Sequence, residues 1–114
     1  AVFRMPEVAL GMVPAAGGTQ MLPRTIGIGP ALDVLLTGRS VTAEEALTLG
    51  LVHRVVPKAE LSDAATHVAG RLASHSPDAV AFAKSAVLTG TDMPLSAGLD
   101  LEQRLAARLA LRRG

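Results

Sequence analysis

The chain has 114 residues, enough for one domain with a modest core, and 49% of them are hydrophobic. A formal net charge of +1 provides no electrostatic footprint for nucleic acid, and the absence of cysteine excludes disulfides, thiol nucleophiles and thiolate metal sites. No apolar run reaches the roughly 20 residues that span a bilayer. We therefore expect a cytoplasmic protein with no nucleic-acid or membrane partner, and an Ala-rich helical interior.

Residues 1 to 16 combine extended character with turn signals, because Pro6 and Pro14 forbid a continuous helix. The glycines at 17 and 18 allow the backbone to turn tightly. A helix is expected to begin there, to bend at Pro23 and to end near Gly27. The following Pro30 suits a first helical position and predicts a short buried helix over 31–36, with Gly38 as its stop.

Thr42 to Glu45 form a capping box, the clearest local signal in the chain. The Thr42 hydroxyl would accept a hydrogen bond from the Glu45 amide, and the Glu45 carboxylate would reach back to the Thr42 amide. This helix should end at Gly50. Residues 51–56 are then predicted to form a short strand that Pro57 closes.

Helices dominate the predicted structure after Pro57. A helix is expected from Glu60, another over 79–88 with Ser76 as its N-cap and Gly90 as its stop, and a last one over 94–113. The second is apolar almost all round, so we expect it to be buried on most sides. In the last helix Asp100 should pair with Arg104. The arginines at 104, 108, 112 and 113 form either a solvated helix face or a contact with phosphates or acidic groups.

Three stretches, read together and in order, resemble one known family. They are residues 6–20 (PEVALGMVPAAGGTQ), residues 36–46 with their LTGR and AEEA pieces, and residues 50–57 with GLV and VVP. The order and spacing of these stretches resemble those of the crotonase superfamily of enoyl-CoA hydratases and isomerases. The resemblance covers nearly the whole chain.

The resemblance implies an α/β fold, a spiral of repeated ββα turns followed by a helical C-terminal region. Residues 1–57 would be the C-terminal part of the spiral core, and residues 58–114 the helical region that packs and oligomerises. The chain would be mostly helical and represent the C-terminal half of a longer enzyme. The complete protein would be a homotrimer or hexamer.

The activity that the resemblance implies is enoyl-CoA hydration, in which the parent enzyme adds water to trans-2-enoyl-CoA thioesters, as in fatty-acid β-oxidation. No cofactor is required, because coenzyme A is part of the acyl-CoA substrate. In hydratases two glutamates hold the water and two backbone amides form an oxyanion hole. The second glutamate falls on Glu7. The first glutamate and both oxyanion amides lie upstream of the motif seen here, so this chain alone should be inactive.

A carboxylate at Glu7 suits this chemistry, since it can hold a water molecule and exchange protons with it. The alternative for Glu7 is an ordinary acid on a surface loop. Ala15 matches a position where hydratases often carry glycine and use its backbone amide to hold the water; alanine retains that amide unless the site needs a positive φ. Met12, Val13 and Leu36 are expected to form apolar walls of the acyl pocket. No metal-binding spacing accompanies the histidines.

Two other functions remain open. A Δ3-Δ2 enoyl-CoA isomerase of the same superfamily would use one carboxylate to move a proton. A function of a different class is a helical assembly fragment with no chemistry of its own. Spiral strands normally pair with earlier turns, so we also expect the extended segments near Val2 and Val52 to have lost those partners and to have unpaired amides.

Overall fold

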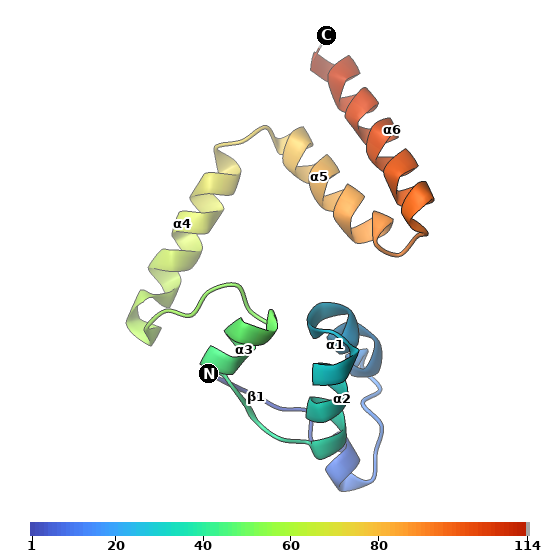
Figure 1. The fold of residues 1–114 in the computed structure, drawn as a ribbon. Helices are drawn as coiled ribbons and strands as arrows, with labels where there is room; N and C mark the ends of the chain where they lie inside the picture. The colour runs from blue at the N-terminus through green and yellow to red at the C-terminus, as the bar shows by residue number, and fades with distance from the viewer. Residues whose placement is uncertain (114) are drawn as a thin grey trace. The chain divides into compact units, whose positions relative to one another are not determined.

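The computed structural model describes residues 1–113, which fall into two compact units that divide after Pro57 (Figure 1). Helices form most of both units, and the described strands are two residues long. The expectation of a mostly helical chain is therefore confirmed.

The first unit begins with a strand that has a partner in the same chain. β1 (Val2–Phe3) pairs antiparallel with β2 (Val41–Thr42), so that Val2 lies opposite Thr42 and Phe3 opposite Val41. The expectation that the segment near Val2 is unpaired is therefore wrong on the edge that faces β2. The partner lies about forty positions along the chain, where the sequence predicts the start of a helix.

Three α-helices and one 3-10 helix complete this unit. They are η1 (Glu7–Leu10), α1 (Gly18–Ile26), α2 (Ile28–Thr37) and α3 (Ala43–Leu49). The bounds of α1 and the end of α2 agree with the predicted ones. α2, however, begins two residues before Pro30, which therefore lies inside the first turn. Proline is tolerated there because the first amides of a helix have no partner within the helix.

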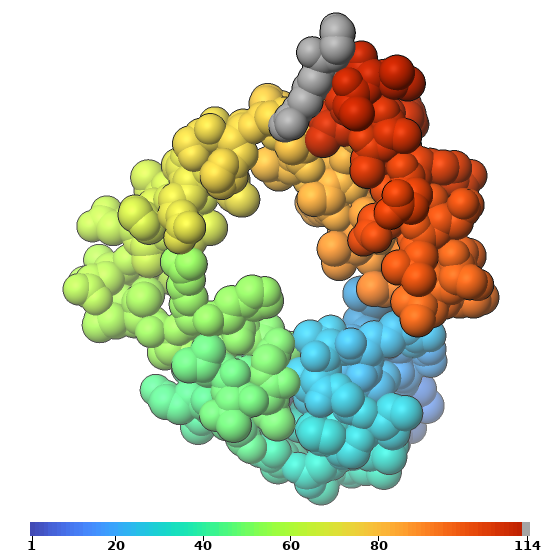
Figure 2. Space-filling view, turned by 45° about the horizontal axis from the view of Figure 1, so that its top comes forward, coloured from blue at the N-terminus to red at the C-terminus, as the bar shows by residue number. Residues whose placement is uncertain are grey.

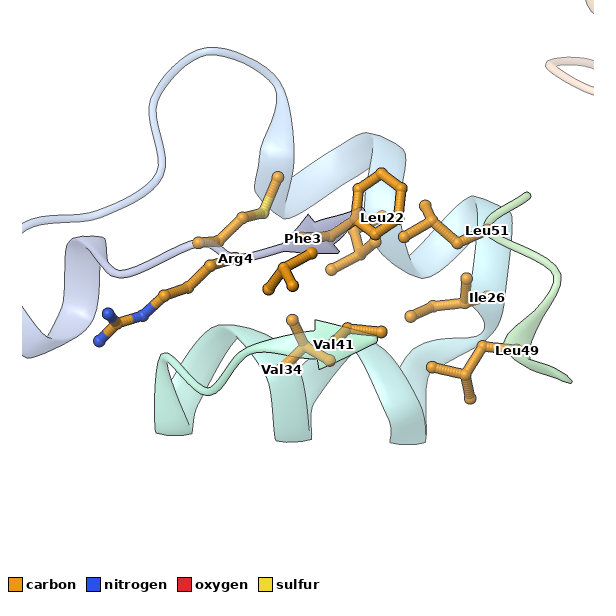
Figure 3. A pocket seen from close by; sticks show the side chains of 10 residues that line it. Phe3, Arg4, Leu22, Ile26, Val34, Val41, Leu49 and Leu51 are labelled. Atoms are coloured by element: carbon orange, nitrogen blue, oxygen red, sulfur yellow. The ribbon is translucent and has the colours of Figure 1, made fainter. Parts of the chain in front are cut away.

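The core of the first unit is small and lies between α1, α2 and β2. Its buried side chains are Leu22, Ala31, Val34, Leu35, Val41 and Ala46. An apolar hollow of about 350 Å³ borders this core. Figure 3 shows Phe3, Leu22 and Leu51 close together in it, with Val34 and Val41 beside them and the guanidinium of Arg4 pointing away.

Glycine ends both α2 and α3, as predicted. Gly38 has φ 64° and Gly50 has φ 83°, in the left-handed region that only glycine adopts readily. The amide of Gly38 donates to the carbonyl of Val34, 3.1 Å away, and so closes the last turn of α2.

The capping box at the start of α3 is half formed. The Thr42 hydroxyl accepts a hydrogen bond from the Glu45 amide at 3.2 Å, as predicted. The Glu45 carboxylate does not reach back to Thr42. It binds the Arg39 guanidinium through two parallel hydrogen bonds of 2.8 Å. A bidentate, charge-assisted pair is stronger than a single bond to a neutral amide, which explains the difference.

The strand predicted over residues 51–56 is not present. The amides of Leu51 and Val52 donate to the carbonyl of Ala46, at 2.9 and 3.3 Å, and so continue the end of α3. β-propensity alone does not make a strand, because a strand needs a neighbour to form its hydrogen-bond ladder.

The second unit contains η2 (Lys58–Glu60), α4 (Leu61–Ala73), α5 (Pro77–Gly90) and α6 (Leu95–Arg113). The Ser76 hydroxyl accepts from the Ala79 amide at 3.4 Å, which confirms the predicted N-cap. α5 continues through Gly90, two residues beyond its expected end. It lies side by side with α6 in a helical hairpin (Figure 2).

The prediction that α5 is buried on most sides is wrong for this unit. Val87 and Leu88 are 61% and 60% exposed, because α6 is the one helix of the unit that packs extensively on α5. The helices approach each other closely where Gly98 faces Gly90. A Cβ built at Gly98 would lie 3.1 Å from the Gly90 carbonyl oxygen.

The arginines of α6 bind groups within the hairpin. Arg104 pairs with Asp100 at 3.0 Å, as predicted, and Arg112 pairs with Asp78 at 3.0 Å. Arg108 and Arg112 also lie over the Phe82 ring, 5.5 and 5.2 Å from its centroid. The side chain of Arg113 lies outside the described residues. Among the described arginines these contacts favour a structural role.

Candidate functional site

Glu7 opens a tight turn of 3-10 helix immediately after Pro6. The turn ends at Gly11, whose φ is 75°. Its amide donates to the Val8 carbonyl at 3.1 Å, and the Met12 amide donates to the Glu7 carbonyl at 2.8 Å. These bonds fix the backbone on which the Glu7 side chain is mounted.

One oxygen of the Glu7 carboxylate is buried without a hydrogen bond. Oε2 is shielded from solvent and accepts no hydrogen bond from any residue between 1 and 113. Buried polar atoms nearly always have a partner, because an unpaired one is costly. The carboxylate is therefore available to a donor that this part of the chain does not supply.

The segment that carries Glu7 is anchored to the end of α2. Arg4 Nε donates to the carbonyl of Gly38 at 2.7 Å. On the other side, a Cβ built at Gly38 would lie 3.6 Å from both the Pro6 Cα and the Ala9 Cβ. The contacts lie before and after Glu7 in sequence, so the segment is held at both ends.

Ala15 lies in the turn between buried Pro14 and the first residue of α1, and it is exposed. No residue other than glycine has a positive φ between 1 and 113, so the alanine is accommodated without backbone strain. Within the same range its amide donates to no other group of the chain. Ala15 therefore has no positive φ, and alanine can replace glycine here and keep a free amide for water.

Two of the three predicted wall residues meet in one pocket. Val13 and Leu36 line an apolar hollow of about 390 Å³, together with Val8, which follows Glu7 directly. Met12 is not among its lining residues and is 54% exposed.

α2 supplies pocket residues that sequence reasoning missed. Ile28, Leu32 and Leu35 line the same hollow as Leu36. Their spacing of three and four residues is the pattern of one helix face, and this signal was present in the sequence. This spacing could have identified the wall that α2 forms. It could not have shown that η1 and the chain around Val13 form other walls of the same pocket.

Arg39 is the centre of an ion-pair cluster that lies between α2 and α3. Arg39 Nε binds Asp33 Oδ2 at 2.7 Å, and the rest of its guanidinium binds Glu45. The hydrogen bond from Arg39 lowers the pKa of the Glu45 carboxyl, and the bonds to Glu45 and Asp33 raise the pKa of Arg39. The cluster joins α2 to α3, and Glu7 has no ionic partner among the side chains that the structure describes.

Residues 1–113 contain neither a metal-binding cluster of side chains nor a membrane-spanning helix. No group of three or more His, Asp or Glu side chains in this range is arranged to hold a metal ion. No helix in the same range is both long and apolar enough to cross a bilayer.

Comparison with known proteins gives a consistent result. Residues 1–111 match the family model described as enoyl-CoA hydratase/isomerase. The chain is 46% identical over 105 residues to a Dictyostelium discoideum protein named "Probable enoyl-CoA hydratase, mitochondrial", covering 92% of this chain and 38% of the relative.

Solved structures resemble the chain equally well. The enoyl-CoA hydratase of Bacillus anthracis matches with a TM-score of 0.92 and 41% identity, over 94% of this chain and 42% of that one. A Thermobifida fusca protein solved in complex with acetoacetyl-CoA matches with a TM-score of 0.87 and 35% identity, over 96% and 44% of the two chains. The chain thus spans about two fifths of the length of these relatives. The expected crotonase-like α/β fold is confirmed.

Proposed function

Because this chain belongs to the enoyl-CoA hydratase/isomerase family, we propose that it carries the water-activating part of an enoyl-CoA hydratase. The complete protein, here called the parent protein, adds water to the double bond of a trans-2-enoyl-CoA thioester. The observation that carries this proposal is the buried Glu7 Oε2, which no described residue of the chain satisfies.

In the proposed mechanism Glu7 works as a general acid/base. Its carboxylate accepts a hydrogen bond from the water whose oxygen bonds to the β-carbon, and takes the proton that this water loses. A proton returned by a carboxyl group to the α-carbon completes the addition, so that a C–O and a C–H bond replace the π bond. The Ala15 amide donates to the same water and orients its lone pair. Burial of Oε2 supports this role, because hydrogen bonds that replace solvent on a desolvated carboxylate are strong.

The reaction also needs groups that the resemblance places upstream of Glu7. They are a first glutamate and two backbone amides that polarise the thioester carbonyl. Loss of one such amide typically costs about 10²–10³ in kcat. We therefore expect residues 1–114 by themselves to have no hydratase activity. The chemistry itself requires no metal, flavin or nicotinamide.

The hollow beside η1 is proposed to receive part of the acyl chain. Val8 brings its wall next to Glu7, and Val13 and Leu36 contribute apolar surface. An apolar pocket beside a catalytic carboxylate would hold the reacting carbons while excluding bulk water. This places Met12 outside the wall.

Three further properties of the parent protein belong to this proposal. It assembles into a homotrimer or hexamer, as the exposed apolar surface of α5 and α6 supports. Its acyl-CoA substrate is supported by the relatives' names and by the acetoacetyl-CoA complex of the Thermobifida fusca protein. A cytoplasmic location stays a prediction from the absence of cysteine.

Replacing Glu7 tests the proposal directly. Glu7→Gln in the parent protein keeps the shape of the side chain but removes proton transfer. We expect kcat for crotonyl-CoA hydration to fall by about 10²–10⁴, while KM changes little. Steady-state kinetics of the purified variant provide the measurement.

Glu44→Gln is the matched control, because Glu44 is an exposed carboxylate in the first turn of α3. It should retain the kcat of the parent protein. An unchanged kcat in Glu7→Gln would remove Glu7 from the mechanism. If the unmodified parent protein isomerises a 3-enoyl-CoA but does not hydrate crotonyl-CoA, the isomerase alternative is favoured.

A further inference from the structure

Gly18, the first residue of α1, is a buried contact point between two segments of the site. A Cβ built on it would lie 3.0 Å from Met5 Cε, 3.1 Å from Met5 Sδ and 3.1 Å from the Pro14 Cβ. Its φ is not in the left-handed region, so an L-residue could adopt its backbone conformation. Space, and not backbone conformation, therefore requires a glycine at this position.

The two neighbours of Gly18 lie next to the two proposed water-binding groups. Met5 precedes Glu7 by two residues in the segment that Arg4 ties to Gly38. Pro14 is joined to Ala15 by the peptide bond whose N–H is the proposed donor to water. The bare Cα of Gly18 thus lies where the carboxylate-bearing segment and the amide-bearing turn come together.

We propose that Gly18 is a positioning residue for hydration, setting the Ala15 amide in register with the Glu7 carboxylate through its contacts with Pro14 and Met5. This inference rests on the proposed function. Gly18 contributes no atom to the reaction; it lets the two groups that hold the water approach each other.

The neighbours of Gly18 differ in how they can respond to an added methyl group. The thioether end of Met5 is flexible, but it packs against the core of the first unit. The Pro14 ring is rigid and buried, so it can yield only by moving its backbone. Contacts of 3.0–3.1 Å require shifts of a few tenths of an ångström. A shift of Pro14 is passed directly to the Ala15 amide.

Gly18→Ala in the parent protein is the first test. Displacements below 1 Å can cost up to about 10² in rate, so we expect kcat for crotonyl-CoA to fall by about tenfold or more. KM should change less than kcat, because Pro14 is the one lining residue of the acyl hollow that a Cβ at Gly18 would press on. A wild-type kcat in a folded Gly18→Ala protein would overturn the inference.

Gly29→Ala is the matched control. Gly29 is the second residue of α2, its φ is not positive, and a Cβ built there meets nothing within 4 Å. This variant makes the same chemical change at a helix start without the contacts. It should keep both kcat and KM; an equal fall in kcat would also contradict the inference.

A second pair of variants decides the question even if Gly18→Ala does not fold. Met5→Ala removes the side chain that joins the two segments, whereas Leu49→Ala removes another partly buried side chain that packs on the same core. Both should lower the melting temperature. We expect kcat to fall about tenfold in Met5→Ala alone; equal values in the two folded variants would refute the positioning role.

The Glu7→Gln variant separates this inference from the proposed function. If Glu7→Gln loses kcat while Gly18→Ala and Met5→Ala retain it, the hydratase mechanism stands and the positioning role fails. If Glu7→Gln retains kcat, the mechanism fails whatever the Gly18 variants do. A fall in both sets supports both conclusions.

Discussion

Arg39 illustrates how one side chain can join two helices. Its guanidinium binds Asp33 in α2 and Glu45 in α3 at 2.7 and 2.8 Å. Its pKa is raised, so the arginine keeps its charge across the whole range in which proteins are studied. The acid sensitivity of the pair is therefore set by the Glu45 carboxyl, whose pKa Arg39 lowers.

This arrangement predicts a pH dependence of stability. Since the folded-state pKa of Glu45 is below its unfolded value, the pair stabilises the fold above the ordinary glutamate pKa of about 4.3. That contribution is lost as the pH falls through the lowered pKa. Glu45→Gln in the parent protein should therefore flatten the acid side of a plot of melting temperature against pH. Arg39→Gln should flatten it as well; an unaltered acid slope in Arg39→Gln would contradict this account.

The roles of single residues were only partly predictable from sequence. A catalytic role for Glu7 was predicted from its motif, because the order of PEVALG and GGTQ is distinctive, and it stays a prediction. The Arg39–Glu45 pair was not predicted, since a capping box and an ion pair make competing uses of the same carboxylate. The contact of Gly18 with Met5 was also not predictable from the sequence, because it depends on the tertiary fold.

At the scale of whole elements, helix ends are the best specified features of this chain. Gly38 and Gly50 end their helices as predicted, because a left-handed residue is a local requirement that glycine meets. The pairing of β1 with β2 and the absence of a strand over 51–56 were not foreseen. Both depend on which distant backbone groups are available, and hydrophobic patterns do not record that.

The end of α2 provides a test at this scale. Gly38→Ala places a side chain at φ 64°, which should cost roughly 1–2 kcal/mol of unfolding free energy. Urea unfolding of the parent protein measures the change. Gly70→Ala is the control, because Gly70 lies within α4 and a Cβ built there meets nothing within 4 Å. It should stabilise by about 0.5–1 kcal/mol. Equal stability of Gly38→Ala and the parent protein would disprove the prediction.

At the scale of the whole molecule, the helical hairpin leaves much apolar surface uncovered. Leu95 and Leu111 are 77% and 81% exposed, and Val87 and Leu99 line a hollow of about 410 Å³ with their neighbours. Exposed apolar side chains in this number are typical of surfaces that bind a partner. It is consistent with the proposed assembly into trimers or hexamers.

Light scattering tests that assembly. The parent protein at micromolar concentration should have the mass of a trimer or hexamer, and Val87→Glu should lower it without loss of helical circular dichroism. Gln103→Glu adds a charge at an exposed position of α6 and should leave the mass unchanged. A monomeric parent protein would rule the proposal out.

The tie between the start of the chain and the end of α2 has a consequence for local unfolding. The β1–β2 pair and the bond from Arg4 to Gly38, which spans 34 positions, close the intervening chain into a loop. Within that loop lie Glu7, Ala15 and Gly18. Such closed segments tend to open as one cooperative unit. Amide hydrogens from η1 to the end of α2 would thus share one opening free energy, and the carboxylate and the amide would lose their geometry together.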